Sequence, residues 1–340
     1  MKILYGIQCT GNGHITRSID LVKELKKHAE VDVLTSGSHS EVSLPFAVKF
    51  PLKGLSYYFG KHGSFDLLKT AFRNNAVRFL RELRSVPVGE YNMVISDFEP
   101  LTAWSAKRKT IYSVSLSNQA SLTYKDVPKP SAIRPLSKWF IRSFCGTNQR
   151  YGLFYKKYNN SLFYPPIREE VRSLKPSVEN YNVVYLPFYG DNRILETLSL
   201  FPKEHWVVFS KHTKHAYQQH NVEVLPISND AFLHALQNCK GVISSAGFGT
   251  TSEALYLKKK LLVIPMKNQY EQQCNAYALE QFGVTRLSTL RPTVAESIQT
   301  WLDSETVPDV AFENENRKIV HRILTDYISY FETRRTKLPE

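Results

Sequence analysis

Cysteines and long apolar runs are both scarce in this sequence, and each scarcity limits what the protein can be. The 340 residues include four cysteines, Cys9, Cys145, Cys239 and Cys274, which are widely spaced and form no C-x-x-C pair. Such spacing argues against a disulfide framework or a zinc site and indicates a reducing compartment. No run approaches the roughly 18 apolar residues that cross a bilayer, and the opening strand is too short for a signal sequence. We therefore expect a soluble, cytoplasmic protein, and because no acidic cluster has the spacing of metal ligands, we expect no metal.

Acidic residues are scarce in one half of the chain only. The sequence carries 44 Lys and Arg against 31 Asp and Glu, a net charge of +13. Residues 1–165 hold 24 of these bases and 11 of these acids, so the whole excess lies there and the remainder is balanced. Such segregation indicates an anionic surface or partner on the side of the first half.

The basic excess is dense between residues 124 and 158, where eight Lys and Arg stand against one acid, Asp126, with aromatic residues interleaved. A helix over residues 136–144 would have an apolar and a basic side, which is typical of a helix lying in a membrane interface. An ordinary amphipathic helix packed on its own sheet explains the pattern equally well. A nucleic-acid surface explains it less well.

Strand and helix patterns alternate along the chain, which predicts the α/β class. A length of 340 residues suggests two domains, each large enough to bury its own core. Pro165 and Pro166 cannot continue a strand or a helix, so they mark the boundary. We place an N-terminal domain at residues 1–165 and a C-terminal domain at residues 166–311. A long helix is predicted from residue 312, within a tail of residues 312–340.

The first glycine turn lies between a strand at residues 2–8 and the helix that follows it. Its sequence, Gly11-Asn12-Gly13-His14, looks like the start of a dinucleotide-binding fingerprint. The third glycine of that fingerprint is replaced by Thr16, and no acidic residue follows the second strand, which ends at Leu34. A nicotinamide cofactor is therefore not expected.

A second glycine loop organises the C-terminal half. The strand at residues 241–244 leads through the loop Ser245–Thr250 into a helix predicted from Thr251, and a second strand at residues 261–265 ends in a polar loop. Both loops lie at the carboxyl ends of their strands, the edge where open α/β sheets bind ligands. Glycines let the backbone approach a ligand, and the free N–H groups of a helix start attract an anion. Glu253, one turn into the helix, has the chemistry to accept two adjacent hydroxyls such as those of a ribose.

Taken with the spacing of Glu253, Pro265 and residues 269–272, this stretch resembles the donor-binding half of the GT-B nucleotide-sugar glycosyltransferases. The likeness is strongest to the bacterial and archaeal relatives of the UDP-glucuronosyltransferases and of the lipid II N-acetylglucosaminyltransferase. The resemblance implies an α/β fold of two Rossmann-like domains facing an interdomain cleft, with the C-terminal helix crossing back onto the N-terminal domain. It implies a metal-independent hexosyltransferase that uses a UDP-sugar as substrate and needs no cofactor.

The resemblance also assigns roles on the donor side. In that family the glycine loop and helix start hold the donor diphosphate, the helix Glu holds the ribose, an acid–Gln pair reaches the sugar, and a turn reads the base. In this sequence those roles fall on Ser245, Gly247, Phe248, Gly249 and Thr250, on Glu253, on Glu271 and Gln272, and on Ile227 and Phe232. The plant and animal members have a His at the position of Ser245, so diphosphate binding here would depend on a hydroxyl and on backbone amides.

On the acceptor side, the family's Gly-x-Gly-His turn corresponds to Gly11, Gly13 and His14, and its His is the general base of inverting members. A helix-start His that only caps or packs is the alternative. An imidazole base needs an acid to fix its tautomer, and Asp97, after the buried strand at residues 93–96, is the best placed. Asp97 could instead cap the next helix, and Glu99 is a weaker rival for the pairing. Asn118 and Gln119, at another strand end, are acceptor contacts by position alone.

We therefore expect an inverting glycosyltransferase whose acceptor hydroxyl belongs to a lipid-linked or anionic glycan. The basic half favours peripheral attachment to the anionic inner membrane face and a role in cell-envelope glycan synthesis. A nucleotide-sugar 2-epimerase, which uses a similar scaffold, is an alternative that would need more acids near the sugar than Glu271 alone. A basic nucleic-acid-binding protein is disfavoured because the donor-like half has no net charge.

Overall fold

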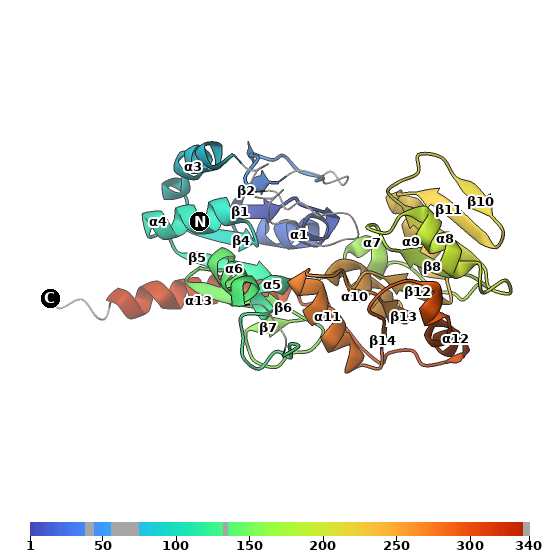
Figure 1. Cartoon of the computed structure of the whole chain (residues 1–340). Helices are drawn as coiled ribbons and strands as arrows, with labels where there is room; N and C mark the ends of the chain where they lie inside the picture. The colour runs from blue at the N-terminus through green and yellow to red at the C-terminus, as the bar shows by residue number, and fades with distance from the viewer. Residues whose placement is uncertain (38–43, 56–74, 132–134, 336–340) are drawn as a thin grey trace.

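The computed structural model describes residues 1–37, 44–55, 75–131 and 135–335. Figure 1 shows two β-sheets side by side, each with helices around it: the N-terminal half in blue to green and the C-terminal half in yellow-green to orange. Pro165 and Pro166 lie between the last strand of the first sheet and the first strand of the second. Within the described part of the chain, no helix is both long and apolar enough to cross a membrane.

Seven parallel strands form the N-terminal sheet, in the order β3-β2-β1-β4-β5-β6-β7. The strand predicted at residues 2–8 is confirmed as β1, and all but its first residue are buried. A continuous apolar run is what a parallel strand covered on both faces requires. The strands are β1 (Lys2–Gln8), β2 (Glu30–Ser36), β3 (Phe50–Pro51), β4 (Met93–Asp97), β5 (Ser113–Ser117), β6 (Gln149–Leu153) and β7 (Leu162–Phe163).

The helix after β1 starts inside the first glycine turn. Gly11 has φ +106°, a conformation that favours glycine, and α1 begins at the next residue. Ile15, Leu21, Val22 and Leu25 form the buried side of α1, at the spacing of one helix face. The described helices of this half are α1 (Asn12–Leu25), α3 (Ala76–Ser85), η1 (Val88–Glu90), α4 (Pro100–Lys109), α5 (Asn118–Ser121) and α6 (Pro135–Phe144).

The C-terminal sheet has the order β10-β11-β9-β8-β12-β13-β14. The edge strand β10 runs antiparallel to β11, and the other pairs are parallel. The strand predicted at residues 241–244 is confirmed as β12, and all of it is buried. The strands are β8 (Asn182–Tyr185), β9 (Trp206–Ser210), β10 (Tyr217–Gln219), β11 (Val222–Pro226), β12 (Gly241–Ser244), β13 (Lys260–Val263) and β14 (Thr285–Arg286).

The helix after β12 starts earlier than the sequence suggests. It begins at Phe248 rather than at Thr251. Gly249 has a low helix propensity, but the packing of the Phe248 ring against Tyr155 overrides it. The helices of this half are α7 (Glu169–Arg172), α8 (Asp191–Leu198), α9 (Asn229–Asn238), α10 (Phe248–Tyr256), α11 (Tyr270–Glu280), η2 (Pro292–Val294), α12 (Ala295–Asp303) and α13 (Asn316–Arg335).

The last helix starts later than predicted, at Asn316 instead of residue 312. Phe312 is buried against the Tyr164 ring, and the Glu315 carboxylate accepts hydrogen bonds from the Tyr164 N–H and from Lys157, so this segment is an anchor rather than a helix. From there α13 runs under the N-terminal half (Figure 1), where it packs on α1 and on the Tyr112 ring.

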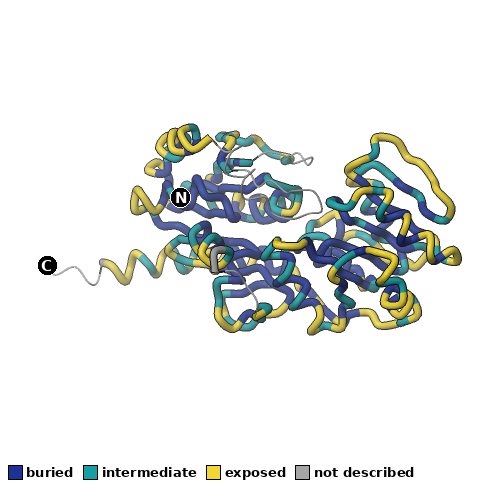
Figure 2. The backbone as a smooth tube through the Cα atoms, in the orientation of Figure 1, coloured by how far each residue is buried: buried dark blue, intermediate teal, exposed yellow. Residues whose placement is uncertain are grey.

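One buried apolar cluster extends through both halves. It includes Ile7 and Leu25 from the N-terminal half and Leu255 and Leu279 from the C-terminal half. Figure 2 shows buried backbone in the strands of both sheets, with exposed backbone on the outer loops and at the far end of α13. The two sheets are therefore joined by packing, and their carboxyl-end loops meet between them.

Candidate active site

The carboxyl ends of β1 and β4 bring His14 and Asp97 together. These strands are parallel neighbours with Ile7 opposite Asp97, so the turn after β1 and the end of β4 lie at one edge of the sheet. His14, in the first turn of α1, has its Nδ1 atom 2.9 Å from Asp97 Oδ1. Asp97 is 1% exposed and the His14 side chain 14%, so the imidazole reaches the surface and its carboxylate does not.

A third group, Arg17, completes this cluster and has no counterpart in the sequence prediction. Its Nε donates to Asp97 Oδ2 at 2.9 Å, and its Nη2 donates to Asp97 Oδ1 and lies 2.6 Å from His14 Nδ1. Arg17 lies three residues after His14, so both side chains project from the same side of α1 toward β4. That spacing is the signal that sequence reasoning could have used.

The charges in the cluster keep Asp97 ionised. Burial alone would raise the pKa of the Asp97 carboxyl, but the charge of Arg17 and the hydrogen bonds from Arg17 and His14 hold it below its ordinary value. An ionised Asp97 accepts a hydrogen bond from Nδ1 and favours the tautomer in which Nε2 carries a lone pair. Arg17 Nη2, which also lies beside Nδ1, can only donate, and its acceptor is then Asp97 Oδ1. The amide Nε2 of Gln119 lies 3.3 Å from His14 Nε2 and can only donate to it, which is consistent with the same tautomer.

Glu99, the rival acid, has a different task. Its carboxylate accepts from the N–H groups of Leu101 and Thr102, so Glu99 is the N-cap of α4. It also accepts from the hydroxyl of Ser36, and its burial raises its pKa. The capping alternative for Asp97 is therefore wrong, because Glu99 caps the helix and Asp97 is free to pair with His14.

Replacing Asp97 by asparagine should destabilise the fold in a pH-dependent way. The substitution leaves Arg17 buried without its anion, which costs about 3–5 kcal/mol for a broken buried pair. The folded-state pKa of Asp97 is depressed, so its stabilisation is complete above its unfolded pKa of about 3.9 and is lost as the pH falls below that value. Urea unfolding of the wild type and of Asp97→Asn is measured at several pH values. The difference between their free energies of unfolding should be largest near pH 6 and should shrink toward pH 2. A gap that is independent of pH would contradict this assignment.

Gln119 links the two halves at the same place. Its Nε2 donates to Glu271 Oε2, in the first turn of α11, at 2.7 Å. The acceptor-side amide and the donor-side acid predicted from the sequence are therefore in direct contact next to His14. Gln119 Oε1 is buried and has no hydrogen-bond partner among the described residues.

Asn118 and Gln272 lie less favourably for a ligand. Asn118 is fully buried and donates to the Leu153 carbonyl at 3.1 Å, which ties α5 to β6. The Oε1 atom of Gln272 accepts from the Met266 N–H at 2.9 Å, which fixes the loop after β13. The structure thus brings Gln119 and Glu271 to the cleft, but it buries Asn118 and holds Gln272 against its own loop.

The second glycine loop leaves the start of α10 without a side-chain cap. Ser245 follows β12 and is buried. Ala246 has φ +47°, which is a strained conformation for a residue other than glycine. The Ala246 carbonyl accepts a hydrogen bond from Asn275 Nδ2 at 3.1 Å. Gly247 is the N-cap of α10 and offers no side chain to the first turn of Phe248, Gly249 and Thr250. These N–H groups carry the positive end of the helix dipole.

The two glycine loops approach each other across the cleft. A side-chain carbon on Gly249 would lie 3.9 Å from the Cα of Gly13. The Phe248 ring is buried against Tyr155, and the Tyr155 hydroxyl bonds to Thr251 Oγ1 at 2.7 Å. Phe248 therefore packs in the core, and its contribution to a ligand site is its backbone N–H.

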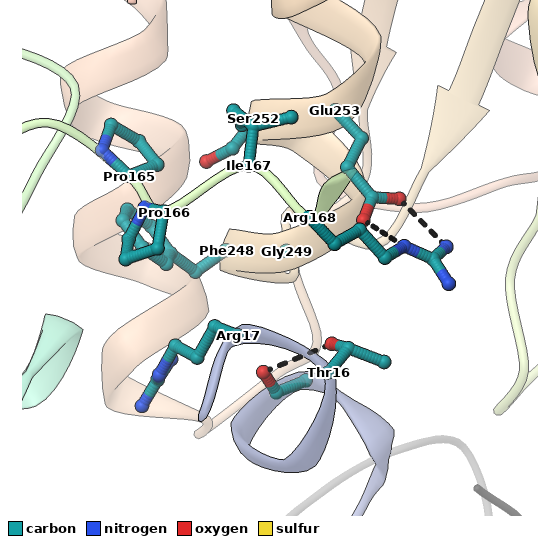
Figure 3. A pocket seen from close by; sticks show the side chains of 11 residues that line it. Thr16, Arg17, Pro165, Pro166, Ile167, Arg168, Phe248, Gly249, Ser252 and Glu253 are labelled. Atoms are coloured by element: carbon teal, nitrogen blue, oxygen red, sulfur yellow. Dashed lines mark hydrogen bonds and ion pairs between the residues drawn. The ribbon is translucent and has the colours of Figure 1, made fainter. Parts of the chain in front are cut away.

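Figure 3 shows a pocket between these loops, in which Glu253 on α10 points toward Arg168. Arg168 Nε donates to Glu253 Oε1 at 2.8 Å and Nη2 to Oε2 at 3.3 Å, while Nη1 donates to Asn229 Oδ1 at 2.6 Å. The pocket is also lined by Ser252, whose hydroxyl is buried and has no partner among the described residues. Arg168 and Ser252 are site candidates that the sequence did not reveal.

The turn predicted to read the base lies beside this arginine. Ile227 follows β11, and Asn229, the partner of Arg168, begins α9 two residues later. Phe232 is half-buried, with its ring 5.5 Å from that of Tyr185 and 5.2 Å from that of Phe209. Ile227 and Phe232 are therefore on the carboxyl edge of the C-terminal sheet, near Glu253.

The helix of the basic segment packs on its own domain. On α6, Ile141 and Phe144 are buried, and the rings of Phe140 and Phe144 contact Phe98. Trp139 is 65% exposed. The described apolar face of α6 is thus covered by the N-terminal half, as the amphipathic-helix alternative predicts, and Trp139 points to solvent.

Comparison with known families gives a match along most of the chain. The model of the family described as glycosyl transferase family 1 matches residues 1–304. No protein of curated function matches the sequence.

Similar solved structures are glycosyltransferases of low sequence identity. UGT2 of Phytolacca americana, complexed with UDP-2fluoro-glucose and pterostilbene, is 12% identical, with a TM-score of 0.60 over 96% of this chain and 93% of that chain. SnogD of Streptomyces nogalater is 15% identical, with a TM-score of 0.54 over 96% and 95% of the two chains. SsfS6 of Streptomyces sp. SF2575, complexed with thymidine diphosphate, is 15% identical, with a TM-score of 0.56 over 97% and 96%. This likeness confirms the expected fold, two Rossmann-like domains of the GT-B class.

Proposed function

The chain belongs to glycosyl transferase family 1 and is a nucleotide-sugar glycosyltransferase. On this premise, we propose that it moves a sugar from a UDP-sugar to an acceptor hydroxyl with inversion at the anomeric carbon. One observation carries the proposal. The uncapped start of α10 lies beside the first turn of α1, which carries His14 paired with Asp97, since a side-chain carbon on Gly249 would lie 3.9 Å from the Cα of Gly13. A base on one side and an anion seat on the other are what displacement of a nucleoside diphosphate needs.

The donor would lie along the C-terminal side of the cleft. The N–H groups of the first turn of α10 would bind the diphosphate together with the Ser245 hydroxyl, Glu253 would accept the ribose hydroxyls, and Ile227 and Phe232 would contact the base. The complexes of UGT2 with UDP-2fluoro-glucose and of SsfS6 with thymidine diphosphate support a pyrimidine nucleotide. Arg168 would orient the Glu253 carboxylate, whose remaining lone pairs stay free for hydroxyl donors.

In the proposed reaction the acceptor oxygen attacks the anomeric carbon while its proton passes to His14 Nε2. The bond from the anomeric carbon to the diphosphate oxygen breaks, and its electron pair leaves with UDP. Asp97 holds the imidazole by Nδ1 and stabilises the imidazolium that forms. Such a positioned base contributes typically about 10²–10⁴-fold to the rate. The α10 amides and helix dipole stabilise the leaving diphosphate, so the reaction is proposed to need no metal or cofactor.

The acceptor is proposed to be an anionic or lipid-linked glycan reached from the inner membrane face, in cell-envelope glycan synthesis. The support is the charge distribution, since the N-terminal half carries the whole excess of +13. Such a surface is attracted to anionic lipids and polymers.

A panel of nucleotide sugars tests the proposed donor. Saturating ligand stabilises the folded protein by RT ln(1 + [L]/Kd), about 2.7 kcal/mol at a hundredfold excess over Kd. We expect UDP and UDP-sugars to raise the melting temperature more than GDP- or ADP-sugars do. No shift with any UDP compound would contradict the assignment, and an epimerised sugar formed without acceptor would favour the 2-epimerase alternative.

Replacing Glu253 by glutamine should remove the discrimination between ribose and deoxyribose. A hydrogen bond to a charged group contributes about 1.5–3 kcal/mol, so the wild type should bind UDP about 10- to 100-fold more tightly than 2′-deoxy-UDP. Glu253→Gln should bind both with similar, weaker affinity, as measured by calorimetry. Glu170→Gln is a suitable control, because Glu170 also pairs with Arg168 but is exposed. A variant that keeps the full preference for UDP would remove Glu253 from the ribose site.

A further inference from the structure

A second cavity, separate from the pocket beside Glu253, is lined by the segment after α5, by α6 and by the start of α11. Its volume is about 230 Å³, and we call it the basic cavity, defined by Tyr124, Lys125, Lys129, Lys138, Arg142 and Tyr270. Five of these residues belong to the N-terminal half, and Tyr270 is the first residue of α11. The cavity therefore lies between the two halves, as the donor pocket does.

The basic cavity adjoins the residues proposed to handle the acceptor. Its wall begins at Leu122, directly after α5, the helix that carries Gln119. On the other side Tyr270 is followed by Glu271, which bonds to Gln119 beside His14. α5, α6 and α11 meet at the middle of the molecule (Figure 1). A molecule seated in the cavity would thus reach the cleft on the side of the general base.

Among the residues that the structure describes, four cations line this space and no carboxylate does. Within the described ranges, none of Lys125, Lys129, Lys138 and Arg142 forms a salt bridge. Asp126, the neighbouring acid, is exposed and accepts from Asn159 instead. Burial lowers the pKa of Lys129, and the charges of Lys138 and Arg142 act in the same direction. Like charges gathered without counter-charges oppose folding, and such local conflicts are expected at functional sites.

The chemistry of the lining selects a phosphate. Ammonium and guanidinium groups form short, strong hydrogen bonds to phosphate oxygens, and several of them converging suit a multiply charged group. A water molecule takes up about 30 Å³ of liquid, so the cavity has room for a phosphate with some of its water. On the basis of the proposed function, we propose that the basic cavity is the acceptor subsite for a phosphate group. A phosphate bound there holds the acceptor hydroxyl toward His14.

The phosphate could be carried by a soluble sugar phosphate or by a lipid headgroup. Trp139, 65% exposed, lies next to Lys138 on α6, where an interfacial aromatic side chain would meet a bilayer surface. Both sources present the same chemical group to the cavity, so the test has one arm for each.

The test compares Lys138→Gln/Arg142→Gln with Lys107→Gln/Arg108→Gln, which removes the same two charges from the exposed end of α4. All four side chains are exposed, so both variants should fold. Each protein is first saturated with UDP to occupy the donor side. Inorganic phosphate is then titrated by thermal shift, and flotation is measured with phosphatidylcholine vesicles with and without phosphatidic acid.

Phosphate should stabilise the wild type and the α4 variant and should bind the cavity variant at least about tenfold more weakly, as loss of charge-assisted bonds predicts. Selective flotation with phosphatidic acid, lost only in the cavity variant, would equally support the proposal and identify a lipid source. Equal behaviour of the two variants in both arms, or no binding in either arm, would overturn it. The phosphate titration and the flotation are then repeated without nucleotide. Failure of UDP to bind the wild type would therefore overturn the proposed function separately and would leave the test of the cavity intact.

Discussion

Replacing His14 by alanine should lower the rate of sugar transfer by about 10²–10⁴-fold, the usual contribution of a positioned general base. UDP affinity should stay within a factor of about two, because His14 lies on the acceptor side and Glu253 and the α10 start are on the other side of the cleft. The rate is measured as UDP release with an acceptor that the wild type glycosylates, and affinity by calorimetry.

The control for His14→Ala is His28→Ala. His28 lies just beyond the other end of α1, is 44% exposed and contacts only Glu24 among the ionic groups described. The control should transfer sugar at the wild-type rate. If His14→Ala also kept that rate while UDP still bound, His14 would not be the base, and the cluster with Asp97 and Arg17 would have only a structural role.

Replacing Gly247 by leucine should abolish donor binding without unfolding the protein. Gly247 has φ −67° and ψ 131°, a conformation that any residue adopts, and a side-chain carbon there meets nothing within 4 Å. The leucine side chain would fill the space in front of the α10 N–H groups. Loss of charge-assisted bonds of about 1.5–3 kcal/mol each should weaken UDP binding by at least about tenfold for each bond lost.

The matched control for Gly247→Leu is Gly89→Leu. Gly89 lies in η1, and a side-chain carbon there also meets nothing within 4 Å. Both variants should unfold at nearly the same urea concentration, and only Gly247→Leu should lose UDP. Unchanged UDP affinity in a folded Gly247→Leu protein would exclude the α10 start as the diphosphate seat.

The fold could be predicted well where strands are continuous apolar runs. The strands at residues 2–8 and 241–244 have the predicted bounds, because buried parallel strands need an unbroken apolar sequence. Helix ends were less predictable. Gly249 suggested a loop but lies in the first turn of α10, and Phe312 suggested a helix but is an anchor before α13.

The site could be predicted where the topology places strand ends together. His14 and Asp97 meet because β1 and β4 are neighbours in register. Arg168 was missed because a sequence does not show which carboxylate a distant arginine will bind. Arg17 was missed although its position three residues after His14 places both side chains on one side of α1. The choice of Asp97 over Glu99 as the partner of His14 is confirmed. The sequence did not show that Glu99 caps α4, because both acids precede Pro100 and only the folded turn decides which one does so.

The proposed binding groups are already paired with one another in this structure. Glu253 is held by Arg168, and Glu271 is held by Gln119 from the other half. Because a carboxylate accepts several hydrogen bonds, Arg168 can remain while ribose hydroxyls bind Glu253. The Gln119–Glu271 bond crosses the cleft, so a sugar that contacts Glu271 must displace or share that amide. Sugar binding is therefore expected to change the contact between the two halves.

The position of bound UDP tests the central claim most directly. A crystal structure of the wild type with UDP is expected to show diphosphate oxygens within hydrogen-bond distance of the backbone nitrogens of Phe248, Gly249 and Thr250, across the cleft from His14. A diphosphate bound away from the start of α10, in the basic cavity for example, would contradict the account.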